Sequence, residues 1–410
     1  MKWVVVAVAV GFVALASLDL FLASAARTAQ AQRHFTAEEI ARGRSFAFQR
    51  KLVAWSATGV ALAALAVLAL TGLGPKLAAA CDRLSGGRWL LTVLLFGGCC
   101  AAVLELLGFP FRLGGGFFLL RAWGLTDRSL LSWLRDYVVG GAVSAVLGAV
   151  LLVGLYSLLR FFPRGWWALA WAGGVLLAVL LMFIAPVVIA PLFNRFTPLR
   201  ETRHAALALR IEALVRAAGL PVGDVLAVDA SRQSQQTNAY FTGFGATRRI
   251  VLYDTLLERH TPDEVLGVVA HEAAHWREQH IVKGLAVAAA GALLGLFLLS
   301  RFLVWAVASG RFGIRAPSDP AALPLILLAI SLAAGLTAPF QNALSRHFER
   351  EADRISLELG TAPGVFIDTE KRLARDNILD VAPSDVSVWL FASHPPIVER
   401  IERAERREGP

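Results

Sequence analysis

The 410-residue sequence contains few charged residues and few cysteines. Only 17% of its residues are charged and 56% are hydrophobic, whereas a soluble domain averages about 25% charged and about 45–50% apolar residues. This composition excludes an ordinary cytosolic enzyme and a disordered chain. Three cysteines without a Cys-x-x-Cys pair indicate neither a disulfide framework nor a thiolate metal site. Repeats and phosphate-binding glycine loops are also absent, and we expect the glycines of Leu113–Gly116 to form a flexible loop.

Long apolar segments dominate what is present. A membrane-spanning helix needs about 20 apolar residues because the hydrocarbon core is about 30 Å thick. The sequence therefore predicts a multi-pass α-helical membrane protein with about seven transmembrane helices. The predicted segments are Trp3–Leu22, Leu52–Leu73, Trp89–Leu107, Tyr137–Leu159, Trp166–Phe193, Gly284–Val307 and Ala321–Phe340.

Two of these segments contain an acidic residue. We expect Asp19 and Glu105 either to line a wet cavity or to reach the interface from a helix end, because a carboxylate is costly in hydrocarbon. The first segment also resembles a secretory signal peptide, since Lys2 precedes the apolar run and small residues (Ala23–Ala26) follow it. Its length favours a retained anchor.

Basic residues predict the orientation in the membrane. The net charge of +9 is interpreted as a topology signal, and no nucleic-acid partner is expected. Arginines concentrate in the first and third loops, which places these loops in the cytoplasm and the N-terminus outside. The two polar blocks, Asn194–Lys283 and Gln341–Pro410, are separated by two crossings. They therefore share one side, which is the cytoplasmic side by the charge count.

The strongest local motif is His271-Glu272-Ala273-Ala274-His275. Residues i and i+4 of a helix share a face, so His271 and His275 can bind one zinc ion with Glu272 beside it as the general base. A helix is well specified here, because Thr261-Pro262-Asp263-Glu264 reads as a capping box with proline at the first helical position. His280 and His204 are expected to be structural or exposed rather than ligands.

A catalytic zinc site needs a third protein ligand. The segment Ser345–Asp353 reads as a helix that Gly360 terminates, and it is rich in candidates. Spacing alone does not choose between Glu349, Glu351, Asp353 and His347.

The sequence resembles a known family, the integral-membrane CAAX prenyl proteases, which are zinc metalloendopeptidases with seven membrane helices. The resemblance extends from about residue 40 to residue 403 and includes several ordered motifs. These are "ARGRSFAFQR" ending at Arg50, "LFNRFTPL" (Leu192–Leu199), "TNAYFTGF" (Thr237–Phe244), "RIVLYDTLLE" (Arg249–Glu258), "HEAAHWREQH" (His271–His280), "SRHFEREAD" (Ser345–Asp353) and "SHPPIVERI" (Ser393–Ile401).

The resemblance implies roles for individual residues. It implies one zinc ion per chain held by His271, His275 and Glu349, with Asp353 orienting a ligand histidine. It also implies that His394 stabilises the oxyanion, that Arg400 acts on substrate or local structure, and that Asn238, Ala239 and Tyr240 run beside the bound peptide. From the residues, an extended peptide could pair with an edge strand near Val225–Asp229 or near Asn238–Phe241.

The sequence departs from the family in two places. Ala273-Ala274 stand where Leu-Gly is common, which leaves catalysis intact because small residues fit there. The third loop (Phe109–Asp136) has Arg121-Ala122 in place of the usual acidic pair, so access and substrate preference are less determined.

The predicted organisation has four parts, and the predicted function is that of a membrane-embedded zinc metalloendopeptidase. Residues 1–193 form five transmembrane helices, 194–283 the first half of a mainly helical zincin-type catalytic domain with a small β-sheet, 284–340 two further helices, and 341–410 the second half. The substrate would be a CAAX-type prenylated C-terminus or a membrane protein. Richness in Ala, Arg, Gly and Leu is typical of GC-rich bacteria and suggests a bacterial cytoplasmic membrane with the site facing the cytoplasm.

Two alternatives remain open at this point. One is a quality-control protease of the bacterial heat-shock type, which has fewer helices. The other is a non-enzymatic transporter or structural membrane protein in which the His-Glu-x-x-His motif arose by chance.

Overall fold

The computed structural model describes residues 2–22, 24–221, 223–243 and 248–408. Within these residues, seven helical segments are long and apolar enough to cross a membrane, which confirms the predicted number. The long helices are α1 (Lys2–Phe21), which is followed by the short α2 (Ala25–Ala31), α3 (Ala37–Leu70), α5 (Trp89–Leu113), α7 (Leu130–Phe161), α8 (Trp166–Ile184), α12 (His280–Ala308) and α13 (Leu323–Glu358).

Several of these helices extend beyond the predicted apolar segments. Helix α3 begins at Ala37 because Thr36 and Glu39 form a capping box: Thr36 Oγ1 accepts from the Glu39 N–H at 3.2 Å, and Glu39 Oε2 accepts from the Thr36 N–H at 2.8 Å. Much of the expected first loop is therefore helical. The expectation of a flexible loop at Leu113–Gly116 is wrong, because Leu113 ends α5 and Gly114–Phe118 continues it as a π-helix into α6 (Leu119–Ala122).

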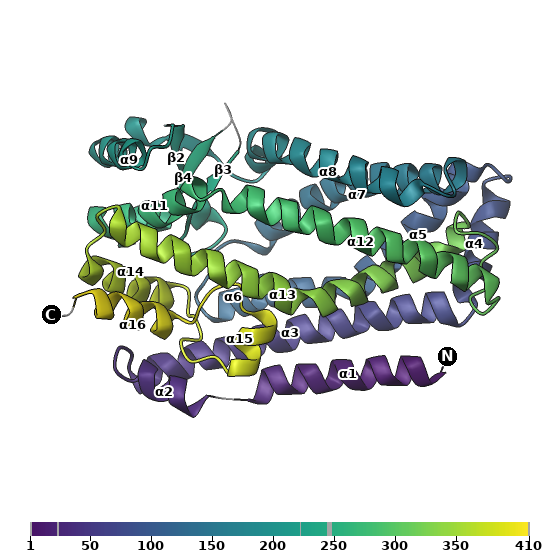
Figure 1. Ribbon diagram of the computed structural model, residues 1–410, viewed down its shortest axis with the longest axis horizontal. Helices are drawn as coiled ribbons and strands as arrows, with labels where there is room; N and C mark the ends of the chain where they lie inside the picture. Colours follow the sequence, from purple (N-terminus) through teal and green to yellow (C-terminus); the bar gives the residue numbers. More distant parts are fainter. Residues whose placement is uncertain (1, 23, 222, 244–247, 409–410) are drawn as a thin grey trace.

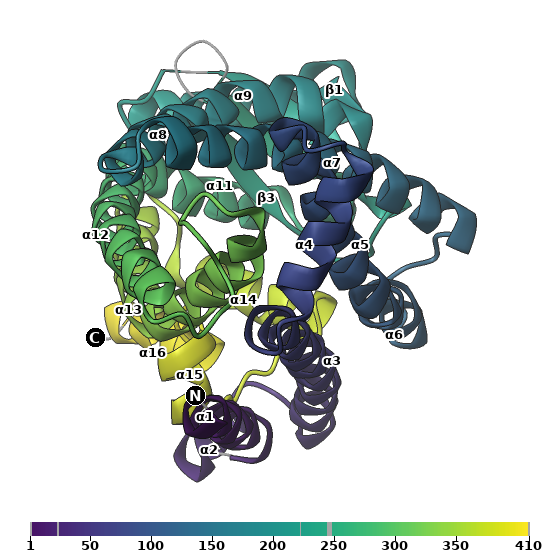
Figure 2. The same cartoon turned by 90° about the vertical axis from the view of Figure 1, so that its right-hand side faces the viewer.

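The remaining helices are short and mostly belong to the polar blocks. They are α4 (Leu73–Leu84), α9 (Ala205–Ala217), α10 (Asp254–Arg259), α11 (Pro262–Arg277), α14 (Pro363–Asp376), α15 (Asp385–Phe391) and α16 (Ile397–Glu408). Viewed along the long axis of the molecule, the long helices form a ring, and α1 lies on its outside (Figure 2). In the side view, α9, α11, α14 and α16 gather at one end of this ring and α4 lies at the other (Figure 1).

A four-stranded sheet completes the polar end of the molecule. Its strands are β1 (Phe196–Pro198), β2 (Asp224–Val228), β3 (Ala239–Thr242) and β4 (Arg249–Tyr253), in the order β1-β2-β4-β3. Only β2 and β4 are parallel. Strand β2 pairs with both β1 and β4, so the prediction of an edge strand near Val225–Asp229 is wrong. Strand β3 lies at the edge of the sheet, so the alternative prediction of an edge strand near Asn238–Phe241 is confirmed.

Asp19 lies near the end of α1, two residues before Phe21, and is buried in an ion pair. Its carboxylate is 4% exposed and accepts hydrogen bonds from Lys51 Nζ at 2.8 Å and from Trp55 Nε1 at 2.9 Å, both on α3. Lys51 Nζ also donates to Ser387 Oγ on α15 at 2.7 Å. This buried ion pair holds α1 against α3, and Lys51 links both helices to α15.

Glu105 forms a second ion pair. Arg112, two turns further along α5, donates to its carboxylate from Nη1 at 2.9 Å, and the Tyr137 hydroxyl of α7 also donates to it. The side chain is half-exposed.

Candidate metal centre and active site

Helix α11 begins where the capping box predicts. Thr261 Oγ1 accepts from the Glu264 N–H at 3.3 Å, and Glu264 Oε2 accepts from the Thr261 N–H at 2.7 Å, with Pro262 in the first turn. The apolar side of the helix, including Val265 and Val269, is buried against the sheet and α9. This packing turns the motif His271–His275 towards α13.

Helix α13 carries the opposite half of the centre. It runs without a break from the seventh membrane segment to Glu358, and Gly360, at φ +101°, terminates it as predicted. The two polar blocks therefore meet at one end of the molecule (Figure 1). This agrees with the prediction that both blocks lie on the same side of the membrane.

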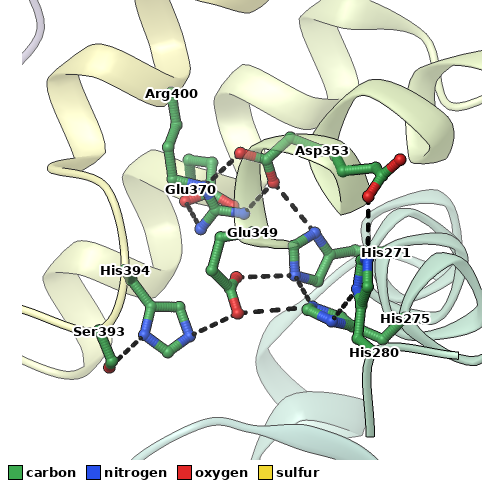
Figure 3. A network of polar contacts seen from close by, with 10 residues as sticks. His271, His275, His280, Glu349, Asp353, Glu370, Ser393, His394 and Arg400 are labelled. Atoms are coloured by element: carbon green, nitrogen blue, oxygen red, sulfur yellow. Dashed lines mark hydrogen bonds and ion pairs between the residues drawn. The ribbon is translucent and has the colours of Figure 1, made fainter. Parts of the chain in front are cut away.

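The side chains of His271, His275 and Glu349 converge, with their ligand atoms within 4.8 Å of one another. The two Nε2 atoms are 3.2 Å apart. Glu349 Oε2 lies 3.3 Å from His271 Nε2, and Glu349 Oε1 lies 3.5 Å from His275 Nε2 (Figure 3). The sequence left four candidates for a third metal ligand on this helix. Of these, Glu349 faces both imidazoles, and His347 is not part of the cluster.

This donor set fits a metal ion. Two imidazole nitrogens and one carboxylate oxygen form the ligand set of many catalytic zinc sites. Glu349 Oε2 is a buried acceptor for which the described residues provide no regular hydrogen bond. Although desolvation opposes it, the carboxylates of Asp353 and Glu349 raise the pKa of His271 to about 10. The local field therefore favours a cation at this point.

Asp353 contacts Nδ1 of His271, the ring nitrogen that does not face Glu349. Its Oδ1 lies 3.0 Å from His271 Nδ1, which is an ion-pair distance without regular hydrogen-bond geometry. Arg400 on α16 donates to Asp353 Oδ2 from Nε at 2.9 Å and to Glu370 on α14 from Nη1 at 2.7 Å. Arg400 is 8% exposed, and its guanidinium is engaged by these two acids.

Glu272 and His394 lie beside the cluster. Glu272 follows His271 on α11, and desolvation raises the pKa of its carboxyl above the ordinary value, with the Phe241 N–H of β3 as a nearby donor. His394 Nε2 lies 3.4 Å from Glu349 Oε1, and its Nδ1 lies 2.9 Å from Ser393 Oγ. The His394 side chain is 62% exposed, so it can meet a ligand that enters from solvent.

Two residues of α13 hold the segment that presents His394. Arg346, which is 6% exposed, donates from Nη1 to the carbonyls of Val388 and Ala392 at 2.8 and 2.5 Å. Asn342 donates to the Leu390 carbonyl at 2.7 Å. Neither residue is predicted from the sequence to support the site; the only available signal is the Asn-x-x-x-Arg spacing, which places both side chains about one helical turn apart.

Asn238, Ala239 and Tyr240 lie at the start of the edge strand β3. Asn238 is exposed, and its backbone carbonyl accepts from the Tyr253 N–H of β4 at 3.1 Å. Strand β3 packs beside α11, so the three residues lie next to the helix that carries Glu272. His280, expected to be structural or exposed, is buried and contacts His275. His204 directly precedes α9 and does not belong to the cluster of His271, His275 and Glu349.

A ring of membrane helices joined to a His-Glu-x-x-His helix and a downstream glutamate defines a membrane metalloprotease. The sequence model of peptidase family M48 matches residues 201–408, and that of the CAAX prenyl protease N-terminal region, described as five membrane helices, matches residues 21–195. The chain belongs to the CAAX prenyl proteases of peptidase family M48. Chance occurrence of the motif in a transporter or structural protein is thereby excluded.

Similar proteins come from bacteria and eukaryotes. An uncharacterized metalloprotease, YhfN of Bacillus subtilis, is 33% identical over 289 residues, which cover 70% of this chain and 67% of that protein. The CAAX prenyl protease 1 homolog of Oryza sativa is 30% identical over 312 residues, covering 72% and 69% of the two chains. The crystal structure of S. mikatae Ste24p superposes with a TM-score of 0.83 at 22% identity, covering 98% of this chain and 97% of that chain, and so shares the fold.

Proposed function

We propose that the chain is a zinc metalloendopeptidase in which His271, His275 and Glu349 hold one zinc ion. The convergence of these three side chains from two helices, with Glu272 beside them, carries the proposal. When bound, zinc supplies Lewis-acid polarisation of the scissile carbonyl and lowers the pKa of water towards about 7.

The protein residues perform the remaining steps. Glu272 takes the proton from the attacking water and passes it to the leaving amine, a role that its raised pKa suits. His394 donates to the oxygen on which negative charge develops, because its ring is exposed beside Glu349. Asp353 fixes the orientation of His271. The substrate backbone pairs with the edge of β3 at Asn238, Ala239 and Tyr240, which aligns an extended peptide with α11.

We also propose that the site faces the cytoplasm of a bacterial cell. The first and third loops, which hold most of the basic loop residues, contact the catalytic blocks directly. Arg27 donates to the Pro383 carbonyl at 2.6 Å and to Asp385 Oδ1 at 2.7 Å, and Thr126 Oγ1 donates to the Gln233 carbonyl at 2.8 Å. Positive loops remain on the cytoplasmic side, so the centre lies there with them.

The proposed substrate is a peptide or protein segment presented at the membrane, either a CAAX-type prenylated C-terminus or a damaged membrane protein. Similarity to proteins named CAAX prenyl protease 1 homolog supports the first class. The bacterial composition of the sequence supports the second.

Elemental analysis together with peptide cleavage tests this function. The purified full chain should contain about one zinc per molecule and cleave a labelled farnesylated peptide, and a chelator should abolish cleavage until zinc is restored. The same peptide without the farnesyl group distinguishes the substrate classes. A chain that binds no zinc, or whose peptidase activity withstands metal removal, would contradict the proposal.

A further inference from the structure

His280, the first residue of membrane helix α12, forms a bridge between a metal-site histidine and an acid. It is 5% exposed. Its Nδ1 lies 3.0 Å from Nδ1 of His275, and its Nε2 lies 3.0 Å from Oε2 of Glu351 on α13. Its ring also stacks on Phe348, with centroids 4.3 Å apart and an interplanar angle of 12°. The ring is therefore fixed in position and in plane.

The contacts allow one consistent placement of protons. His275 presents Nε2 to His271 and Glu349, so this nitrogen must be unprotonated to bind a metal ion. The proton of the neutral ring is then on Nδ1, and it is donated to Nδ1 of His280. The proton of His280 is consequently on Nε2, which donates to the carboxylate of Glu351.

The two metal-site histidines are thus held differently. His271 meets a carboxylate directly, since Asp353 Oδ1 lies 3.0 Å from its Nδ1. His275 reaches its carboxylate through a second imidazole.

A local backbone conformation makes this bridge possible. Residues five positions apart in a regular α-helix point about 140° away from each other, so His280 would turn away from His275 if α11 simply continued. Instead α11 ends at Arg277, and Gln279 adopts a left-handed conformation with φ +56°. Non-glycine residues with positive φ are strained and cluster at functional sites. Here the strained residue directly precedes His280 and returns its ring to His275.

We propose that His280 is a positioning residue that fixes the tautomer and the orientation of His275, and that Glu351 holds His280 in turn. This inference rests on the proposed zinc site. It connects membrane helix α12 to His275 directly through His280, and membrane helix α13 indirectly through Glu351 and His280.

Zinc affinity of four variants tests the assignment in the purified full chain. The dissociation constant is measured by competition with a chromogenic chelator. His280→Phe keeps an aromatic ring to stack on Phe348 but removes both nitrogens. His280→Asn loses the stacking but retains an acceptor near the position of Nδ1. Glu351→Gln removes the charge, and Glu358→Gln is its control, since Glu358 lies on the same helix and pairs with Arg354 on the surface.

Loss of hydrogen bonds to ligand histidines weakens metal binding by about 10- to 100-fold. We expect this loss in His280→Phe, a smaller loss in His280→Asn and Glu351→Gln, and wild-type affinity in Glu358→Gln. A purely packing role for His280 predicts the reverse order for the two His280 variants. Thermal unfolding of the zinc-free proteins shows whether each variant is folded.

Wild-type affinity in His280→Phe, or weaker binding by His280→Asn than by His280→Phe, would overturn the role of His280. An unchanged Glu351→Gln would overturn that of Glu351. If the wild-type chain binds no zinc, the proposed function fails together with the role of His280. If the wild-type chain binds zinc and only the variants depart from expectation, the proposed function stands and only the role of His280 or Glu351 fails.

Discussion

Arg400 donates from Nε to Oδ2 of Asp353 at 2.9 Å, although 47 residues separate them along the chain. A second bond of 2.7 Å from Nη1 reaches Glu370, and all three side chains are buried. The C-terminal helix α16 therefore supplies the cation that compensates two carboxylates behind the metal centre.

Replacement of Arg400 by methionine should destabilise the protein strongly. The variant keeps most of the side-chain volume but leaves Asp353 and Glu370 as buried charges without their cation, and breaking such a pair costs about 3–5 kcal/mol. Thermal unfolding in detergent, followed by tryptophan fluorescence, measures the effect. Arg403→Met is the control, because Arg403 pairs with Glu399 one turn away in a partly exposed contact worth about 0.3–0.5 kcal/mol. Equal shifts in the two unfolding temperatures would contradict the assignment.

Glu272→Gln should abolish peptide hydrolysis while zinc content stays at the wild-type level. The amide has nearly the same shape as the carboxylate but cannot accept the proton of the attacking water. Turnover of a labelled peptide and elemental analysis of the same sample check both halves of the expectation. Glu278→Gln, six residues along at the end of α11, should remain active. Near-normal turnover by Glu272→Gln would exclude Glu272 as the base.

His394→Ala should lower kcat by about 10²- to 10³-fold, the usual effect of removing one oxyanion donor. Its Nε2 is close to Glu349, at 3.4 Å, so zinc content must be measured alongside the rate. Unchanged zinc supports the catalytic role, whereas loss of zinc would make His394 a ligand. Ser393→Ala removes only the neighbour of His394 Nδ1 and should have a smaller effect on kcat.

The buried pair between Asp19 and Lys51 predicts a non-additive response to substitution. Asp19→Ala leaves an uncompensated charge on Lys51, so its unfolding temperature should fall more than that of the double variant Asp19→Ala with Lys51→Met. Unfolding of the single and double variants in detergent measures this coupling. If the double variant loses the sum of the two single effects, the pair makes no contribution to the attachment of α1.

Much of this architecture was predictable because its signals are local. The apolar segments determine the membrane helices, and Thr261 with Glu264 determines the start of α11. The proposed third metal ligand was not predictable from spacing, since Glu349, Glu351 and Asp353 are all on one helix and only its packing against α11 distinguishes them. In the structure, Glu349 faces both His271 and His275. Glu351 contacts His280, and Asp353 contacts His271.

Features that depend on tertiary contacts or unusual backbone conformations were missed. Nothing local to Asp19 identifies Lys51 as its partner, because the two residues lie on different helices. The contacts of His280 with His275 and Glu351 have no local signal, because the turn before His280 contains no glycine to mark a positive φ. The glycines of Leu113–Gly116 predict a flexible loop because glycine runs ordinarily interrupt helices, but these residues form the end of α5 and part of the π-helix Gly114–Phe118.

The left-handed conformation of Gln279 predicts that glycine is tolerated there. Glycine adopts positive φ without the steric cost of a side chain, which is about 1–2 kcal/mol for other residues, although it adds backbone entropy to the unfolded chain. Gln279→Gly should therefore leave the unfolding temperature unchanged or slightly raised, with wild-type zinc affinity because His280 keeps its place. Gln341→Gly, the same substitution within the regular helix α13, should destabilise the protein by about 1 kcal/mol. Gln279→Val should also destabilise it, since a β-branched side chain resists this conformation. If Gln279→Gly were as destabilising as Gln341→Gly, the strained turn would not be what positions His280.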